Sequence, residues 1–208
     1  MTESKQALIC VIDDDDAVRE SVTMLLATVG VAACGYRDCQ AFLKDEAARA
    51  ADAMILDVRL PGINGLEFHE KFAERIGDMP VIFISGHGDI PMAVRAMRQG
   101  ALDFLQKPFA EQTLIDRVNQ AIALAAQRRE KRSEVAAVQS LLDQLTPRER
   151  EVLDYMVQGH SSKVIANALD ISARTIEQHR ARIMEKMQVG SVAELVHALT
   201  LAGEARHP

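Results

Sequence analysis

Short apolar runs of strand-like composition alternate with segments of helical periodicity along the first 125 residues. The apolar runs are Leu8–Ile12, Val31–Tyr36, Ala53–Leu56, Val81–Ile84 and Leu102–Leu105. The segments with apolar residues at helical spacing are Asp16–Val29, 38–48, 64–75, 89–99 and 110–125. Strands that alternate with helices are joined by right-handed crossovers, which produce a parallel sheet with helices on both faces. We therefore expect a doubly wound α/β domain over residues 1–125.

Polar residues stand at the carboxyl ends of four of the predicted strands. Asp13 and Asp14 follow the first strand, Asp57 the third, Ser85 the fourth and Lys107 the fifth. In open parallel sheets these ends lie at one edge, where ligands bind. Clustered carboxylates are tolerable if Mg²⁺ binds between them. A carboxylate beside Mg²⁺ and a lysine can attack a phosphoryl group, so the pattern predicts a phosphoryl-transfer site.

The acidic run that ends the first strand continues into the next helix. Asp15 is expected at the rim of the pocket, where it would add to the outer shell of the metal. Asp16 is expected to belong to the following helix, as its N-cap or as a first-turn residue near the positive end of the helix dipole.

Residues 126–141 are expected to form a helical linker. No proline occurs between Pro108 and Pro147, and no glycine between Gly100 and Gly159. Apolar residues follow the 3, 4, 3 spacing of a coiled-coil seam at Val135, Val138, Leu142 and Leu145. This seam is only about two turns long, which favours a solvated linker. A short coiled coil joining two subunits remains the alternative.

Residues 142–208 show only helical patterns. The stretch "LTPRERE" places Thr146 at an N-cap, Pro147 at the first helical position and Glu149 in a capping box. Three further helices each begin after a serine, so we expect a compact four-helix unit. Residues 141–208 carry eight basic and nine acidic residues, so overall charge counts against nucleic-acid binding and local clustering must decide.

The composition indicates a cytoplasmic protein. No apolar run approaches the length of a membrane-spanning helix, and the first ten residues lack the pattern of a signal peptide. The three cysteines, Cys10, Cys34 and Cys39, lack metal-ligand spacing, and we expect them to be reduced structural thiols.

The motifs together resemble a known family. "DD", "D-x-R-x-P-G-x-x-G", "SGHGD" and "KPF" follow the first, third, fourth and fifth strands, as in response-regulator receiver domains. "LTPREREVL" and "KVIANALDISARTIEQHRARIMEKM" resemble the LuxR-type helix-turn-helix. Almost the whole chain is similar to the FixJ/NarL family of two-component response regulators, and within it most similar to FixJ. This resemblance implies the strand order 2-1-3-4-5 for the receiver and an all-α domain after the linker.

The resemblance also implies roles for residues of the receiver. Asp57 would be the phospho-acceptor. Mg²⁺, or Mn²⁺, would be bound by Asp57, by Asp14 directly, by Asp13 through water and by the main-chain carbonyl of Arg59. Ser85 and Lys107 would hold the phosphoryl oxygens, and the Lys107–Pro108 peptide bond would be cis.

Three further positions match residues that act after phosphorylation. Phe104, together with Ser85, would form the switch. Arg59 and His87 occupy the positions that tune how long the acyl phosphate survives.

The helices Lys163–Leu169 and Ser172–Met187 would form the helix-turn-helix. By resemblance, Glu177, Gln178 and Ala181 would face bases, which fits the ability of Gln to read adenine and of Glu to accept from cytosine N4. The residues expected to contact phosphate are Lys163, Arg174, Thr175, Arg180 and Arg182. Ser162 departs from the family, which usually has Asn at this position.

The resulting functional expectation is a regulator controlled by phosphorylation. A sensor histidine kinase would phosphorylate Asp57, the face formed by the fourth helix and fifth strand would pair two chains, and the dimer would bind promoter DNA. We expect RNA polymerase as a further partner and activation as the outcome. The receiver would catalyse only its own phosphoryl transfer and autodephosphorylation.

Two alternatives come from other functional classes. A Mg²⁺-dependent phosphohydrolase would need a general acid two residues after Asp57, and that position is Arg59, which stays protonated. A protein-interaction module would use the helices of the second domain without binding DNA.

Overall fold

The computed structural model describes residues 6–86 and 90–203, and the chain divides into two compact units, Met1–Arg128 and Arg129–Pro208. The first unit is built on five parallel strands in the order β2-β1-β3-β4-β5. The strands are β1 (Leu8–Ile12), β2 (Ala32–Tyr36), β3 (Ala53–Asp57), β4 (Val81–Ser85) and β5 (Asp103–Gln106). The expected α/β class and strand order are thus confirmed.

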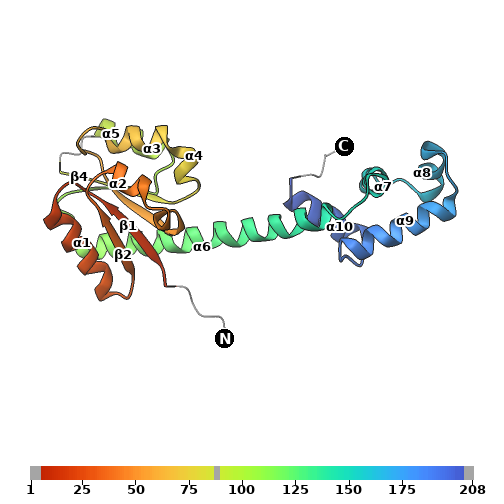
Figure 1. Ribbon diagram of the computed structural model, residues 1–208, viewed down its shortest axis with the longest axis horizontal. Coiled ribbons are helices and arrows are strands. Elements are labelled where there is room, and N and C mark those ends of the chain that lie inside the picture. The colour runs from red at the N-terminus through yellow and green to blue at the C-terminus, as the bar shows by residue number, and fades with distance from the viewer. Residues whose placement is uncertain (1–5, 87–89, 204–208) are drawn as a thin grey trace. The chain divides into compact units, whose positions relative to one another are not determined.

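Helices cover both faces of this sheet (Figure 1). The helices of the unit are α1 (Asp16–Thr28), α2 (Cys39–Lys44), α3 (Gly65–Lys71), α4 (Ala73–Ile76), α5 (Ile90–Arg98) and the first part of α6 (Glu111–Leu142), with a 3₁₀ turn, η1, at Ala47–Ala50. The crossovers place α1 and α6 on one face and α2 to α5 on the other.

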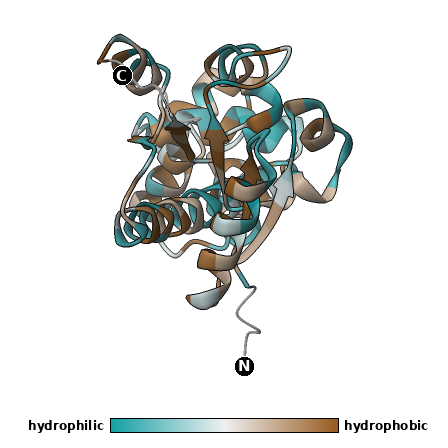
Figure 2. Cartoon of the chain, turned by 90° about the vertical axis from the view of Figure 1, so that its left-hand side faces the viewer, coloured by the Kyte–Doolittle hydropathy of each residue, from teal (hydrophilic) through white to brown (hydrophobic). Residues whose placement is uncertain are grey.

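Alternate residues of each strand supply two separate cores. Ile9 and Val11 of β1 point toward α1 and α6, whereas Cys10 and Ile12 point toward α2 and α3. Burial on both faces explains the nearly continuous apolar strands, which appear brown in the centre of this unit in Figure 2. The sheet is therefore a rigid platform whose strand ends can hold a site.

Three helical segments differ from the periodicity prediction. The segment predicted at 38–48 is divided into α2 and η1, because Asp45 ends α2 in an extended conformation. The segment predicted at 64–75 is divided at Phe72, whose backbone leaves helical geometry (φ −112°, ψ 20°). The segment predicted at 110–125 continues without a break to Leu142, as expected where strong helix formers follow one another without proline or glycine.

The second unit contains four further helices in its described residues. They are α7 (Pro147–Val157), α8 (Ser162–Leu169), α9 (Ala173–Lys186) and α10 (Val192–Leu201). The hydroxyl oxygen of Thr146 accepts a hydrogen bond from the backbone amide of Glu149, and the carboxylate of Glu149 accepts one from the backbone amide of Thr146. The predicted capping box is thus confirmed.

The proposed coiled-coil seam is largely used inside this unit. Leu142 and Leu145 are buried in the same core as Val152, Ile165 and Ile183, and their exposed fractions are 0% and 6%. They close the end of the four-helix unit, so they are not available as a seam between subunits.

Among residues 6–86 and 90–203, none of the helices combines the length and the apolar character that crossing a membrane requires.

Candidate functional site

The strand register brings four predicted residues to one edge of the sheet. Asp57 is the last residue of β3, and Ser85 is the last residue of β4. The backbone amide of Lys107 donates to the carbonyl oxygen of Ser85 over 2.8 Å. The backbone amide of Asp13 donates to the carbonyl oxygen of Tyr36 over 3.1 Å. Asp13, Asp57 and Ser85 are all buried.

Lys107 bridges the two buried carboxylates. Its Nζ lies 2.5 Å from Oδ2 of Asp13 and 2.8 Å from Oδ1 of Asp57. The other oxygen of Asp57, Oδ2, accepts from the amide of Arg59 over 2.6 Å. Both oxygens of Asp57 therefore have donors, which fixes the carboxylate at the end of β3.

Burial, hydrogen bonds and neighbouring charges together set the pKa values of Asp57 and Lys107. Burial raises the pKa of Asp57, with a further increase from the charge of Asp13, while Lys107 and the Arg59 amide lower it in part. Burial alone would lower the pKa of Lys107, but its hydrogen bonds to Asp13 and Asp57 outweigh burial and raise it. The ammonium is thus held charged between the two acids.

The loop after β1 divides the acidic run between the site and the start of α1. Oδ1 of Asp13 accepts from the amide of Asp15 over 3.0 Å, and Oδ1 of Asp15 accepts from the amide of Ala17 over 2.9 Å. Asp15 is therefore the N-cap of α1. The outer-shell role expected for its side chain stays a prediction. Asp16 is the first helical residue, as one of the two expectations had it.

Arg19 ties this loop to α1. Its guanidinium donates to the carbonyl of Asp13 over 2.6 Å and pairs with the carboxylate of Asp16. Sequence reasoning missed Arg19, because nothing in the apolar periodicity separates it from the other polar residues of the helix.

Gly65 is a second residue that sequence reasoning did not assign to the site. A Cβ at this position would lie 2.2 Å from the carbonyl oxygen of Asp57, a distance that cannot be accommodated. Glycine therefore allows the start of α3 to approach the end of β3. The last glycine of the "D-x-R-x-P-G-x-x-G" motif was the available signal.

The donor set at this edge suits a hard divalent cation. In the described part of the chain, no group of three or more His, Cys, Asp or Glu residues is arranged to hold a metal ion. Two buried carboxylates, Asp13 and Asp57, nevertheless lie together, and Asp14 is exposed beside them. Oxygen ligands in this number fit Mg²⁺, which retains several of its waters.

The remaining predicted receiver residues occupy separate places. Phe104 is half-buried on β5 and packs against the core beneath α2 to α5. Arg59 is exposed, and the Lys107–Pro108 bond is cis, as the resemblance implies. His87 lies outside the described residues.

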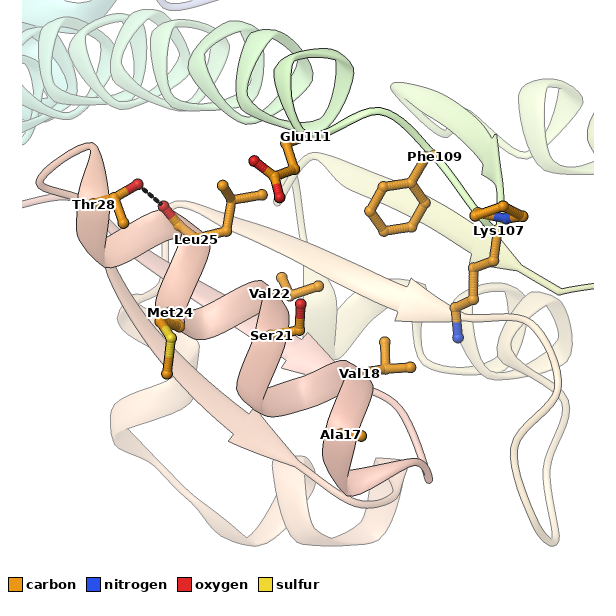
Figure 3. Close-up of a pocket in the computed structure, with 11 residues that line it drawn as sticks. Ala17, Val18, Ser21, Val22, Met24, Leu25, Thr28, Lys107, Phe109 and Glu111 are labelled. Atoms are coloured by element: carbon orange, nitrogen blue, oxygen red, sulfur yellow. Dashed lines mark hydrogen bonds between the residues drawn. The ribbon is translucent and has the colours of Figure 1, made fainter.

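A pocket of about 790 Å³ adjoins Lys107 between α1 and the start of α6. Figure 3 shows Val18 and Val22 of α1 facing the ring of Phe109 across this pocket. Most of its lining is apolar, so it offers a hydrophobic surface next to the lysine that contacts Asp57.

The second unit presents a helix-turn-helix formed by α8 and α9. Asp170 ends α8 in the left-handed conformation (φ 54°), and Ser172 caps α9 by accepting from the amide of Thr175. Ile165, Ile176 and Ile183 are buried between the helices, while Leu169 and Ile171 pack against them as expected.

The residues predicted to contact DNA lie together on α9 and the start of α8. Lys163, Arg174, Glu177, Gln178, Ala181 and Arg182 are exposed, and Thr175 and Arg180 are half-buried. No described acidic group forms an ion pair with any of the four cationic side chains, Lys163, Arg174, Arg180 and Arg182. They remain available for phosphates.

Lys186 has a different role from that of these cations. Its Nζ lies 2.6 Å from the buried carboxylate of Glu149 and 3.0 Å from the carbonyl of Gln144. Lys186 therefore joins the end of α9 to the start of α7, and the positive charge available to DNA on α9 is smaller than its sequence indicates.

Comparison with known families finds two matching family models, one within each of the two units. Residues 9–119 match the model described as "Response regulator receiver domain". Residues 143–199 match "Bacterial regulatory proteins, luxR family".

Named relatives match nearly the whole chain. The response regulator protein TmoT of Ectopseudomonas mendocina is 41% identical over 92% of this chain and 87% of its own length. The transcriptional regulatory protein FixJ of Azorhizobium caulinodans is 42% identical over 94% and 92%.

Solved structures give the same result. The response regulator StyR matches with a TM-score of 0.82 and 38% identity over 94% of this chain and 98% of its own. Full-length FixJ from B. japonicum matches with a TM-score of 0.56 and 38% identity over 96% and 98%.

Proposed function

Because the chain belongs to the two-component response regulators that join a receiver domain to a LuxR-family DNA-binding domain, we propose that phosphorylation of Asp57 controls its binding to promoter DNA. The observation that carries this proposal is the bridge from Lys107 to Asp13 and Asp57 at the carboxyl edge of the sheet. A buried carboxylate held by an ammonium is suited to receive a phosphoryl group whose charge the same ammonium can balance.

The residues of this edge divide the reaction between them. A carboxylate oxygen of Asp57 attacks the phosphorus of a phosphohistidine on the kinase, the P–N bond breaks, and an acyl phosphate forms. Lys107 and the hydroxyl of Ser85 then hold the phosphoryl oxygens. Mg²⁺, held by Asp13, Asp14, Asp57 and the carbonyl of Arg59, supplies charge neutralisation when bound.

The kinase would approach across the surface next to Lys107. The apolar pocket between α1 and α6 lies on this path, so a donor domain that reaches Asp57 would contact α1 and Phe109. Arg59 is exposed two residues beyond Asp57, where it, like His87, would affect access of water to the acyl phosphate and hence its lifetime.

Phosphorylation would alter the face formed by α5 and β5. Movement of Ser85 toward the phosphoryl group would draw Phe104 inward, because the two residues lie on neighbouring strands. The α5 helix exposes Ile90, Val94 and Met97, the first by 81%. This apolar surface supports pairing of two chains through α5 and β5 in the phosphorylated form.

The paired helix-turn-helix units would then bind a two-fold DNA site. In this proposal, Glu177, Gln178 and Ala181 face bases, and Lys163, Arg174, Thr175, Arg180 and Arg182 contact phosphates. The modest charge of α9 makes one unit a weak binder, so affinity depends on dimerisation. Contact of the bound dimer with RNA polymerase would convert binding into activation.

Phosphorylation with a small donor tests the first step. Acetyl phosphate and Mg²⁺ should phosphorylate the protein, and mass spectrometry should place the modification on Asp57. Asp57→Asn should remain unmodified, while Asp154→Asn, which removes an exposed carboxylate on α7, should be modified like the unaltered protein. Full modification of Asp57→Asn would contradict the proposal.

A further inference from the structure

A side-chain hydrogen bond connects the two helices of the helix-turn-helix on the surface assigned to DNA. Oγ of Ser162, the first residue of α8, donates to Oε1 of Glu177 on α9. The preceding residue, Ser161, is the N-cap of α8, so Ser162 has no capping function. This is the position at which the chain departs from the asparagine usual in the family.

The negative charge of the Glu177 carboxylate is unfavourable on a surface that contacts DNA unless it makes a specific contact. It is exposed among Arg174, Arg180 and Arg182, and it would approach a polyanion. A carboxylate in the major groove is favourable only when it accepts a hydrogen bond from a base amino group. An unrestrained Glu side chain also loses rotamer freedom when a contact fixes it.

We propose that Ser162 determines base specificity by holding the Glu177 carboxylate in place as an acceptor, so that the regulator selects cytosine at the base that Glu177 faces. This inference rests on the proposed DNA-binding function. Ser162 acts through Glu177 and is therefore a positioning residue.

The chemistry of the major groove favours cytosine over the other bases. Ser162 occupies one acceptor site of Oε1, and Oε2 makes no hydrogen bond to a described residue, so the carboxylate faces the groove purely as an acceptor. Cytosine presents the N4 amino group, whereas guanine N7 and O6 and thymine O4 are acceptors that a carboxylate repels. Adenine presents N6 next to the acceptor N7, so it fits a group with both donor and acceptor better than a carboxylate.

The test measures base preference with the full, phosphorylated chain. A preferred duplex is obtained by in vitro selection, and the affinity is measured for all four base pairs at each position. Glu177→Gln identifies the position that Glu177 reads, because discrimination changes there alone. Ser162→Ala should reduce the preference for cytosine at this position about threefold to tenfold, the range expected for one hydrogen bond.

Two further variants separate positioning from a general effect. Ser162→Thr keeps the hydroxyl and should retain the preference for cytosine. Ser133→Ala removes a hydroxyl at an exposed position of α6 and should leave the base preference unchanged. A cytosine preference unchanged in Ser162→Ala, or selection of another base under Glu177, would overturn the inference. An absence of any salt-sensitive duplex binding by the unaltered phosphorylated chain would instead overturn the proposed function.

Discussion

The ammonium of Lys107 lies 2.8 Å from the carboxylate of Asp57, although the two residues are 50 positions apart in the chain. The same ammonium contacts Asp13, so one cation is shared by two buried acids and one negative charge remains. In the proposed mechanism this cation and Mg²⁺ act on the same carboxylates, which makes their binding interdependent.

Replacement of Lys107 by Met should separate metal binding from phosphoryl transfer. Loss of one positive charge beside two carboxylates should raise the affinity for Mg²⁺ by about tenfold, because like charges no longer repel. Phosphorylation by acetyl phosphate should become slower, since the phosphoryl oxygens lose a donor.

Isothermal titration calorimetry measures the Mg²⁺ affinity directly, which suits a chain without tryptophan. Lys71→Met, which removes an exposed lysine of α3, is the control. An unchanged Mg²⁺ affinity in Lys107→Met would show that the metal does not share the carboxylates with this lysine.

Truncation of Leu142 tests how the end of α6 is used. Leu142→Ala should lower the free energy of unfolding of the second unit by about 2–5 kcal/mol, because it leaves a cavity in a closed core. Val135→Ala, which truncates a half-buried side chain of α6, should lower the free energy of unfolding much less. Chemical denaturation gives both values. If Leu142→Ala weakened self-association and left the unfolding free energy unaltered, the coiled-coil interpretation would be the correct one.

The three cysteines should differ in reactivity. Burial raises the pKa of the Cys10 thiol and that of the Cys39 thiol to about 12 each, whereas Cys34 is exposed. A thiol with such a pKa is about one part in ten thousand thiolate at pH 8, and the thiolate is the reactive form. Native iodoacetamide labelling at pH 8 should therefore modify Cys34 alone. Peptide mapping that finds rapid labelling of Cys10 or Cys39 would contradict the described packing of β1 or of α2, respectively.

Two substitutions on α9 should affect DNA binding in different ways. Gln178→Ala should relax base preference at one position by about 1–3 kcal/mol, because it removes a base contact. Arg182→Ala should weaken binding to all sequences alike and reduce the salt dependence by about one ion, because it removes a phosphate contact. Affinities for matched and mismatched duplexes at several salt concentrations distinguish the two. A uniform loss in Gln178→Ala would place that residue on phosphate.

The strand ends were predictable because sheet geometry depends on local sequence. Asp57 and Ser85 each follow an apolar run, and parallel strands bring such positions to one edge whatever the loops do. The cap formed by Asp15 was not predictable, because adjacent aspartates are equivalent until the direction of the loop is known.

Long-range packing accounts for the other differences. Leu142 and Leu145 have coiled-coil spacing, but tertiary contacts with α7 to α9 determine which surface they cover. Lys186 counts as a free charge in the sequence, and only the fold shows that the buried Glu149 is its partner. The contact between Ser162 and Glu177 joins two helices, so no periodicity within either helix indicates it.

The most direct test of the central claim is the affinity of the protein for a selected duplex before and after treatment with acetyl phosphate and Mg²⁺, measured by fluorescence anisotropy. The unaltered protein should bind more tightly after treatment, with a steep salt dependence and dimer stoichiometry. Asp57→Asn should bind equally weakly under both conditions. An equal increase in affinity for both proteins, or no increase for either, would contradict control of DNA binding through Asp57.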